Sequence, residues 1–287
     1  MIFKSELDRL ISDALAEDLG TGDVTTRAIN VNKKTAIGRI LCRQNGIVAG
    51  VQIAKHVFLQ HDQDLNVKID HKDGDTVSAN EAIIVVEGKA ASILSSERVA
   101  LNFLSHLSGI ATLTGKYVHR IRHTKAKITD TRKTTPLFRA IEKEAVRAGG
   151  GFNHRFGLYD MVLIKENHIQ AAGGIKSAVE QTRRFMIETQ LRLKIEVETT
   201  NLDEIHEALE CNIDRIMLDN MTLEEIREAV QLINHQTEVE VSGGVTLDTV
   251  VDIAETGIDY ISVGALTHSA PAFDLTLLFD EVVHEGT

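Results

Sequence analysis

From about Lys127 onward, short runs of β-branched residues alternate with segments of helical periodicity. The expected strands are Lys127–Thr129, Met161–Ile164, Leu193–Val197, Arg215–Leu218, Val239–Val241 and Tyr260–Val263. The expected helices are Pro136–Ala148, Ile175–Thr189, Asp203–Leu209, Leu223–Asn234 and Leu247–Glu255, with Thr222 and Thr246 as N-caps. Such alternation predicts βαβ crossovers and a parallel sheet. Because six strands are too few for a closed eight-fold barrel, we expect an open, incomplete α/β barrel.

The first hundred residues do not alternate in this way, and they predict a different, α+β architecture. Strands are expected at Ala36–Cys42, Leu65–Ile69 and Ile83–Val86, after an amphipathic N-terminal helix. An Asp-Gly pair within Lys72–Asp75 indicates a turn, and a long helical pattern begins at Ser92. We therefore predict a sandwich-like domain over residues 1–110, a barrel domain over 111–270, and a tail, 271–287, that packs back on the first domain.

Composition excludes several classes of protein. The chain has 31 basic and 42 acidic side chains, a net charge of −11, and no Trp or basic stripe, so we expect no nucleic-acid partner. No segment reaches the roughly 20 apolar residues that span a bilayer, and the N-terminus does not have the pattern of a signal peptide. Cys42 and Cys211 are far apart and belong to no CxxC motif, which favours a reducing compartment and a cytoplasmic location.

One stretch, Thr129–His168, departs from the acidic character of the chain. It carries seven Arg or Lys residues and five Asp or Glu residues, besides His154 and His168. A polyanionic small molecule would be repelled by the protein as a whole, so only a local cationic pocket could capture it. This stretch is the candidate for that pocket.

The residues that follow the expected strands form a second pattern. In parallel α/β barrels the active site lies at the C-terminal ends of the strands, where the βα loops converge. The residues at these ends are Asp130, Arg132 and Lys133; Lys165, Glu166, Asn167 and His168; Glu198; Asp219 and Asn220; Ser242, Gly243 and Gly244; and Gly264. Every end offers a charged, polar or glycine residue, which packing alone does not explain.

These ends suggest separate roles. The SGGV and VGALT segments place small residues where backbone N–H groups can approach a phosphate, although the glycines could also serve only as tight turns. Glu198 and Asp219 suit Mg²⁺ and sugar hydroxyls, although isolated acids after strands are more often solvated loop residues. Lys165 has a rival interpretation as a Schiff-base nucleophile. His119 and His123 have metal-ligand spacing but no third ligand, which favours an ordinary exposed face.

The order of several motifs resembles the quinolinate phosphoribosyltransferase family, also called carboxylating nicotinate-nucleotide pyrophosphorylases. The motifs are EDLGTGDVTT, SSERVALNFLSHLSGIATLT, TRKTTP, EKEAVRAGGGFNHRFGLYDMVLIKENHI, IEVE, IMLDN, SGGV and ISVGALTHSAP. The resemblance covers nearly the whole chain. Leu137 stands where the family usually has glycine, and Glu166 where it commonly has aspartate. Neither departure removes a charge from the expected pocket.

The resemblance implies a two-domain subunit that forms at least a homodimer, in which the partner's N-terminal domain completes each barrel site and supplies Arg98. It implies that Arg132, His154, Arg155, Arg98 and Lys165 bind the two carboxylates of quinolinate. Lys133 would lie towards phosphoribosyl pyrophosphate, and Glu198 and Asp219 would hold its ribose hydroxyls and Mg²⁺, directly or indirectly. Ser242, Gly243, Gly244 and Gly264 would bind its 5′-phosphate. Lys133 or Lys165 would assist decarboxylation.

Three alternatives stay open on the sequence. The first is a paralogue associated with molybdate transport, with the same fold and a different base substrate. The second is a barrel lyase or aldolase that uses Lys165 as a Schiff base. The third is a phosphosugar sensor without enzymatic activity. The retained Arg132, His154 and Arg155 favour a dicarboxylate substrate over the first of these.

Overall fold

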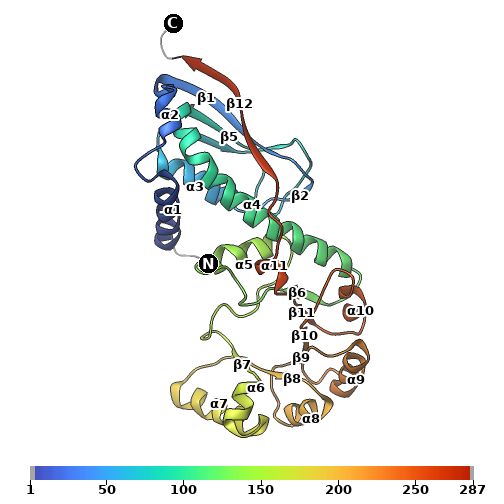
Figure 1. The fold of residues 1–287 in the computed structure, drawn as a ribbon. Helices are drawn as coiled ribbons and strands as arrows, with labels where there is room; N and C mark the ends of the chain where they lie inside the picture. Colours follow the sequence, from blue (N-terminus) through green and yellow to red (C-terminus); the bar gives the residue numbers. More distant parts are fainter. Residues whose placement is uncertain (1–3, 285–287) are drawn as a thin grey trace. The chain divides into compact units, whose positions relative to one another are not determined.

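The computed structural model describes residues 4–284, which form two compact units (Figure 1). The first unit takes in the chain up to Gly115, Pro136–Gly150 and the residues from Ser269 on. The second comprises Lys116–Thr135 and Gly151–His268. Within residues 4–284, none of the helices is long and apolar enough to cross a membrane.

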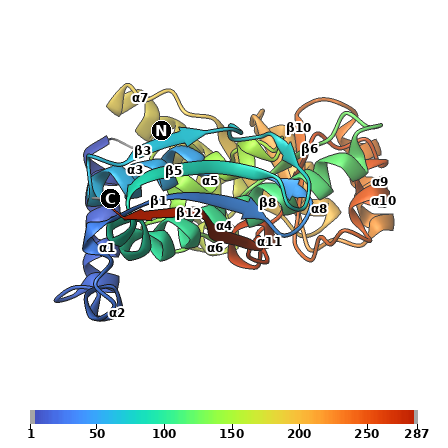
Figure 2. The ribbon, with the colours of Figure 1, turned by 90° about the horizontal axis from the view of Figure 1, so that it is seen from above.

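The first unit is built on a four-stranded antiparallel sheet. Its strands lie in the order β12 (Leu275–His284), β1 (Lys34–Cys42), β5 (Ala82–Lys89) and β3 (Asn66–Ile69). Figure 2 shows the four strands side by side over the helices of this unit. The other elements are α1 (Lys4–Leu19), α2 (Val24–Ala28), η1 (Val31–Lys33), β2 (Gly46–Ile47), α3 (Val51–His61), β4 (Thr76–Val77), α4 (Ala90–Ile121) and α5 (Arg139–Ala148). The α+β expectation for this part of the chain is confirmed.

The C-terminal segment and α5 are the two distant pieces of sequence that join this unit. Strand β12 pairs with β1 in antiparallel register from Lys34 to Cys42. Helix α5, which the alternation assigned to the barrel, packs in the first unit instead. It buries Ile141 and Val146, and its buried Glu142 lies 2.8 Å from His106 Nε2 on α4. A polar pair inside this interface holds α5 against α4, a contact that the helical period of α5 does not reveal.

The second unit is the open parallel barrel. Its six strands lie in the order β6 (Lys127–Thr129), β11 (Tyr260–Ser262), β10 (Glu238–Ser242), β9 (Arg215–Asp219), β8 (Ile195–Thr199) and β7 (Val162–Ile164). Its helices are α6 (Glu166–Ala172), α7 (Ile175–Thr189), α8 (Leu202–Glu210), α9 (Leu223–Ile233), α10 (Val250–Ala254) and α11 (Ala265–His268). At one edge, Phe152 forms an isolated parallel bridge with Thr129. The expected incomplete α/β barrel is confirmed.

Two expected N-caps have different outcomes. Thr222 caps α9 as expected: its hydroxyl accepts a bond from the N–H of Glu225, whose carboxylate accepts the N–H of Thr222 at 2.7 Å. Thr246 also makes the bonds of an N-cap: its hydroxyl accepts the N–H of Thr249 at 3.3 Å, and its carbonyl oxygen accepts the N–H of Val250 at 3.0 Å. These bonds close a turn, however, and the regular helix α10 begins only at Val250, later than expected. The N–H of Thr246 donates back to the hydroxyl of Thr249 at 3.0 Å.

Helix α4 contains two glycines that differ in what surrounds them. A Cβ on Gly109 would lie 2.2 Å from the carbonyl oxygen of Pro271, in the segment that enters β12. Nearby, the N–H of Phe273 donates to the carbonyl of Ser105 at 2.9 Å. A Cβ on Gly115 would instead meet the flexible end of Ile47, at 2.5 Å from its Cδ1.

We therefore predict that Gly109→Ala lowers the free energy of unfolding by about 1–3 kcal/mol, because backbone cannot yield to the added methyl group. Gly115→Ala is the matched control on the same helix. It should change stability by no more than about 1 kcal/mol, since better helix propensity offsets the shift of Ile47. Urea unfolding followed by circular dichroism would measure both. Equal losses in the two variants would contradict the proposed close approach.

Candidate active site at the open end of the barrel

A cavity of about 760 Å³ lies at the C-terminal ends of the barrel strands. Eleven of the twelve residues to which the resemblance gives a binding role line it: Arg132, Lys133, His154, Arg155, Lys165, Glu198, Asp219, Ser242, Gly243, Gly244 and Gly264. The twelfth, Arg98, belongs to the first unit, on the exposed face of α4, so its assignment to the site stays a prediction. Parallel strands bring their carboxyl ends to one edge of the sheet, which is why loops distant in sequence meet here.

The cavity is locally cationic although the chain is acidic. Its lining includes four Arg or Lys residues and three carboxylates. Burial, followed by the neighbouring charge of Arg132, lowers the pKa of Arg155. Arg155 Nη1 also donates to the carbonyl oxygen of Met161 at 3.2 Å, which fixes the side chain. Two guanidinium groups close enough to repel each other form a site that a bound anion would stabilise.

Lys165 follows β7 and begins α6. Its Nζ forms an ion pair with the carboxylate of Glu198, and its N–H donates to His168 Nδ1 at 3.0 Å. A Schiff-base nucleophile must reach a carbonyl carbon, whereas the Lys165 nitrogen is held by Glu198. The geometry of Lys165 therefore favours a binding group over a covalent nucleophile.

The glycines after β10 and β11 have structural reasons of their own. Gly243 and Gly244 adopt φ angles of 95° and 62°, which favour glycine. A Cβ on Gly243 would lie 2.1 Å from Asn220 Oδ1, and one on Gly264 would lie 3.1 Å from Lys133 Cδ. The turn after β10 thus requires Gly243 and Gly244, whereas Gly264 only leaves room for the Lys133 side chain. Because the three glycines also line the cavity with bare backbone, they remain candidates for binding a phosphate group.

The carboxylates of Glu198 and Asp219 come from adjacent strands, β8 and β9, and both line the cavity. Asp219 Oδ2 accepts a hydrogen bond from Asn220 Nδ2 at 2.8 Å. Mg²⁺ is commonly held by one or two carboxylates together with phosphate oxygens of a substrate and water. Two acids without a third ligand fit an ion of that kind, which arrives with its substrate, better than a permanent metal site.

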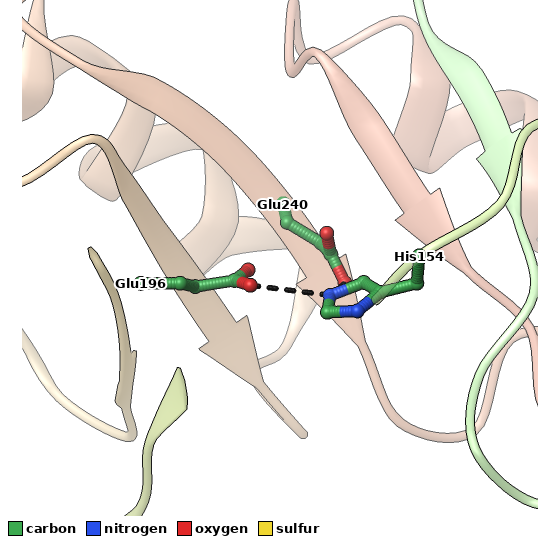
Figure 3. Close-up of side chains that lie close together, drawn as sticks. All are labelled: His154, Glu196 and Glu240. Carbon is green, nitrogen blue, oxygen red and sulfur yellow. Dashed lines mark ion pairs between the residues drawn. The ribbon is translucent and has the colours of Figure 1, made fainter. Parts of the chain in front are cut away.

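His154, Glu196 and Glu240 form a cluster at the floor of the cavity, which His154 and Glu240 line (Figure 3). His154 Nε2 lies 3.1 Å from Glu196 Oε2 and 3.3 Å from Glu240 Oε1, and both carboxylates are fully buried. The sequence reasoning missed the two glutamates. A signal was present, because Glu196 lies two residues before Glu198, and Glu240 two before Ser242. Side chains two residues apart in a strand point to the same face of the sheet. Glu196 therefore faces the same side as Glu198, and Glu240 the same side as Ser242.

The cluster holds a proton strongly. Burial by itself lowers the pKa of His154, but hydrogen bonds and charges from Glu196 and Glu240 outweigh it and raise that pKa to about 9. Burial, and then the charge of Glu240, raise the pKa of Glu196. The N–H of Arg155 donates to His154 Nδ1 at 2.8 Å, which favours a neutral ring instead. Two carboxylates shut away from water outweigh one backbone bond, so we assign the ring as imidazolium near pH 7.

This assignment predicts how stability depends on pH. Because the pKa of His154 is raised from 6.5 to about 9, its contribution to stability is complete below pH 6.5 and is lost as pH rises through 9. The free energy of unfolding should fall by about 1–3 kcal/mol between these values. His154→Gln should remove this dependence. Denaturant unfolding of both proteins at several pH values checks it, and parallel pH curves would disprove the assignment.

His119 and His123, which have metal-ligand spacing in the sequence, do not share a site. His119 Nε2 lies 2.8 Å from Arg122 Nη1, and His123 Nε2 lies 3.0 Å from Glu255 Oε1. Each imidazole is exposed or half-buried at a different contact. Among the residues that the structure describes, the cluster of His154, Glu196 and Glu240 is the one group of three such side chains close enough to share an ion.

Comparison with known proteins identifies the chain as an enzyme of the phosphoribosyltransferase class. Residues 110–278 match the sequence model of the quinolinate phosphoribosyl transferase C-terminal domain, and residues 23–108 match that of its N-terminal domain. The chain belongs to the quinolinate phosphoribosyltransferase family.

Relatives and a solved structure cover almost the whole chain. Quinolinate phosphoribosyltransferase [decarboxylating] 1b of Nicotiana tabacum is 44% identical over 96% of this chain and 83% of its own length. The probable nicotinate-nucleotide pyrophosphorylase [carboxylating] of Bacillus subtilis is 40% identical over 98% of this chain and 96% of its own. The crystal structure of NadC from Streptococcus pyogenes superposes with a TM-score of 0.93 at 37% identity, covering 100% of this chain and 99% of its own.

Proposed function

We propose that this protein converts quinolinate and phosphoribosyl pyrophosphate into nicotinate mononucleotide, pyrophosphate and CO₂, a step of NAD biosynthesis. The single observation that carries the proposal is that Arg132, Arg155 and Lys165 line one cavity, which also holds three carboxylates and two glycine loops. Membership of the family supports the same conclusion.

The dianionic substrate matches the cationic side of the cavity. Quinolinate carries two carboxylates on one planar ring, and guanidinium forks bind carboxylates with two parallel hydrogen bonds. We assign its carboxylates to Arg132, Arg155 and Lys165, with His154 at the floor of the site. The buried imidazolium adds positive charge without exposing the ring to water, since the His154 side chain is only 6% exposed.

The sugar substrate fits the opposite side. Glu198 and Asp219, which line the cavity, would accept hydrogen bonds from ribose hydroxyls. The loops Ser242–Gly244 and Gly264 would hold the 5′-phosphate. Mg²⁺, held with the substrate by the same two acids, would neutralise charge on the pyrophosphate. Lys133 reaches into the cavity beside Gly264, where it would contact the phosphates.

The reaction then proceeds in two stages. The ring nitrogen bonds to the anomeric carbon as the carbon–oxygen bond to pyrophosphate breaks, and Glu198 and Asp219 stabilise the positive charge that develops on that carbon. The alkylated nitrogen is cationic. The adjacent carbon–carboxylate bond can therefore break, which releases CO₂ and leaves the electron pair on a ring carbon that takes up a proton. We assign assistance in this second stage to Lys133 or Lys165, the two ammonium groups of the cavity.

Arg155→Lys should raise the KM for quinolinate by about 10–100-fold, since one ammonium cannot replace a bidentate fork, and leave the KM for phosphoribosyl pyrophosphate within about threefold. Arg227→Lys, at an exposed arginine of α9, is the control. The assay mixes protein, both substrates and Mg²⁺ and measures nicotinate mononucleotide and CO₂. Absence of both products from the unmodified protein would refute the proposed function.

We propose further that the working enzyme is a homodimer in which Arg98 completes the partner's site. Arg98→Ala and Lys165→Ala should each abolish activity alone. Mixed and reassembled in equal amounts, they should regain about a quarter of it, because half of the dimers then contain one intact site. Analytical ultracentrifugation gives the oligomeric state. Failure to regain activity in verified mixed dimers would place Arg98 in its own subunit's site or outside the site.

The cellular location is also a proposal. Both cysteines are buried and unpaired, and burial raises the pKa of the Cys42 thiol to about 11. Such thiols are suited to a reducing compartment, and we propose the cytoplasm. Some plant relatives are named as chloroplastic or mitochondrial, which shows that members of the family work in more than one compartment.

Nothing in the structure favours the alternatives. The relatives reported above carry names of the decarboxylating enzyme, not of a molybdate-transport protein. Turnover of a panel of pyridine acids would reveal a different base substrate. Borohydride trapping would reveal a Schiff base at Lys165, and binding of phosphoribosyl pyrophosphate without pyrophosphate release would reveal a sensor.

A further inference from the structure

The cluster at the floor of the cavity brings ionisable groups from three separate segments into the barrel interior. Glu196 comes from β8 and Glu240 from β10, with β9 between them in the sheet. His154 comes from the loop that follows the bridge at Phe152. In Figure 3 the two glutamates lie on separate strands and converge on the same ring nitrogen of His154.

Arg215 balances this buried charge from β9. Its Nη1 donates to Glu240 Oε2 at 2.8 Å, its Nη2 donates to Glu238 Oε2 at 3.1 Å, and its guanidinium lies 3.9 Å from the centroid of the Tyr260 ring. Two buried carboxylates thus face one guanidinium and one imidazolium. Removing carboxylates from water is unfavourable, and apolar side chains would fill a barrel interior with less penalty. Stability alone therefore does not explain the cluster.

The cluster connects to the cavity through His154. While Nε2 faces the two carboxylates, Nδ1 lies 2.8 Å from the backbone nitrogen of Arg155, and the N–H of His154 donates to Asp130 Oδ1 at 2.9 Å. Because Arg155 follows His154 in the chain and its backbone touches the ring, a shift of the imidazole would move Arg155 as well. His154, Arg155 and Glu240 line the cavity, whereas Glu196 does not.

We propose that Glu196 and Glu240 are positioning residues for the dicarboxylate subsite, which act by holding the His154 ring and, through it, Arg155. The inference rests on the proposed function, because that function places quinolinate at His154 and Arg155. Partners behind a ligand-binding histidine commonly change affinity by about 10–100-fold when removed, without touching the ligand. Glu196 stands in that relation to this site. Glu240 contacts the same ring nitrogen and holds it in the same way, although it also lines the cavity.

The test compares Glu196→Gln, Glu240→Gln and the control Glu238→Gln. Glu238 lies on the same strand as Glu240 and shares its contact with Arg215, but it faces Lys194 at 3.1 Å and not His154. We expect Glu196→Gln and Glu240→Gln to raise the KM for quinolinate at least about tenfold, with the KM for phosphoribosyl pyrophosphate and the melting temperature close to those of Glu238→Gln. When either glutamate substitution is combined with His154→Gln, the KM for quinolinate should rise no further than in His154→Gln alone, since the glutamate acts through the histidine.

A second measurement, independent of activity, tests the contact between Glu196 and His154 directly. It applies even if Glu240→Gln folds poorly or if quinolinate is not the substrate. In protein labelled with ¹⁵N-histidine, the His154 Nε2–H signal, assigned by its loss in His154→Gln, should shift in Glu196→Gln and stay in place in Glu238→Gln.

The outcomes separate the hypotheses. Parallel changes in both KM values, additive effects with His154→Gln, or an equal quinolinate effect in Glu238→Gln would overturn the inference. An unmoved Nε2–H signal in Glu196→Gln would do the same. Stoichiometric metal in the purified protein that is lost in Glu196→Gln would assign the cluster to a metal instead. A raised KM in His154→Gln with none in either glutamate variant would refute only the inference. No turnover of quinolinate by the unmodified protein would refute the proposed function.

Discussion

Two carboxylates shut away from water lie at the floor of the cationic cavity, and the arrangement of the site depends on them. Glu196 and Glu240 require positive partners because an unpaired buried charge is strongly unfavourable. His154 pairs with both glutamates, and Arg215 pairs with Glu240. Arg155 follows His154 in the chain, and its backbone nitrogen lies 2.8 Å from the imidazole. The need to neutralise the two buried glutamates thereby fixes His154, and with it the position at which Arg155 can bind an anion.

The open parallel sheet explains why these groups meet. One group of polar side chains lies at the starts of the strands, where Arg215, Glu238 and Tyr260 contact one another. A second group lies at the ends of the strands, where Lys165, Glu198 and Asp219 line the cavity. Arg215 reaches inward from the first group to Glu240, beneath the second. Polar contacts thus extend along the inside of the barrel from one end to the other, and they fix the register of neighbouring strands as well as the site.

Much of the site was predictable from the sequence, because the period of strands and helices marks where strands end. That reasoning placed Arg132, Lys165 and Asp219 at strand ends, and the structure brings them into one cavity. Prediction failed where side chains compete with the local pattern. The Thr246 side chain and the N–H of Thr249 bond to each other and close a turn, so α10 begins at Val250 and not at Leu247. Helix α5 has the period expected of a barrel helix, yet its contacts lie in the other unit.

The sequence by itself determined the alternation of elements, the acidic surplus and the local excess of cations, because these depend only on residue type and spacing. Tertiary structure alone decided that Glu196 and Glu240, on strands 44 residues apart, share one imidazole. It also decided that β12 completes a sheet begun at Lys34. The physical reason is the same in both cases. Pairing of distant strands and neutralisation of buried charge depend on distances in space, which no local pattern of residues specifies.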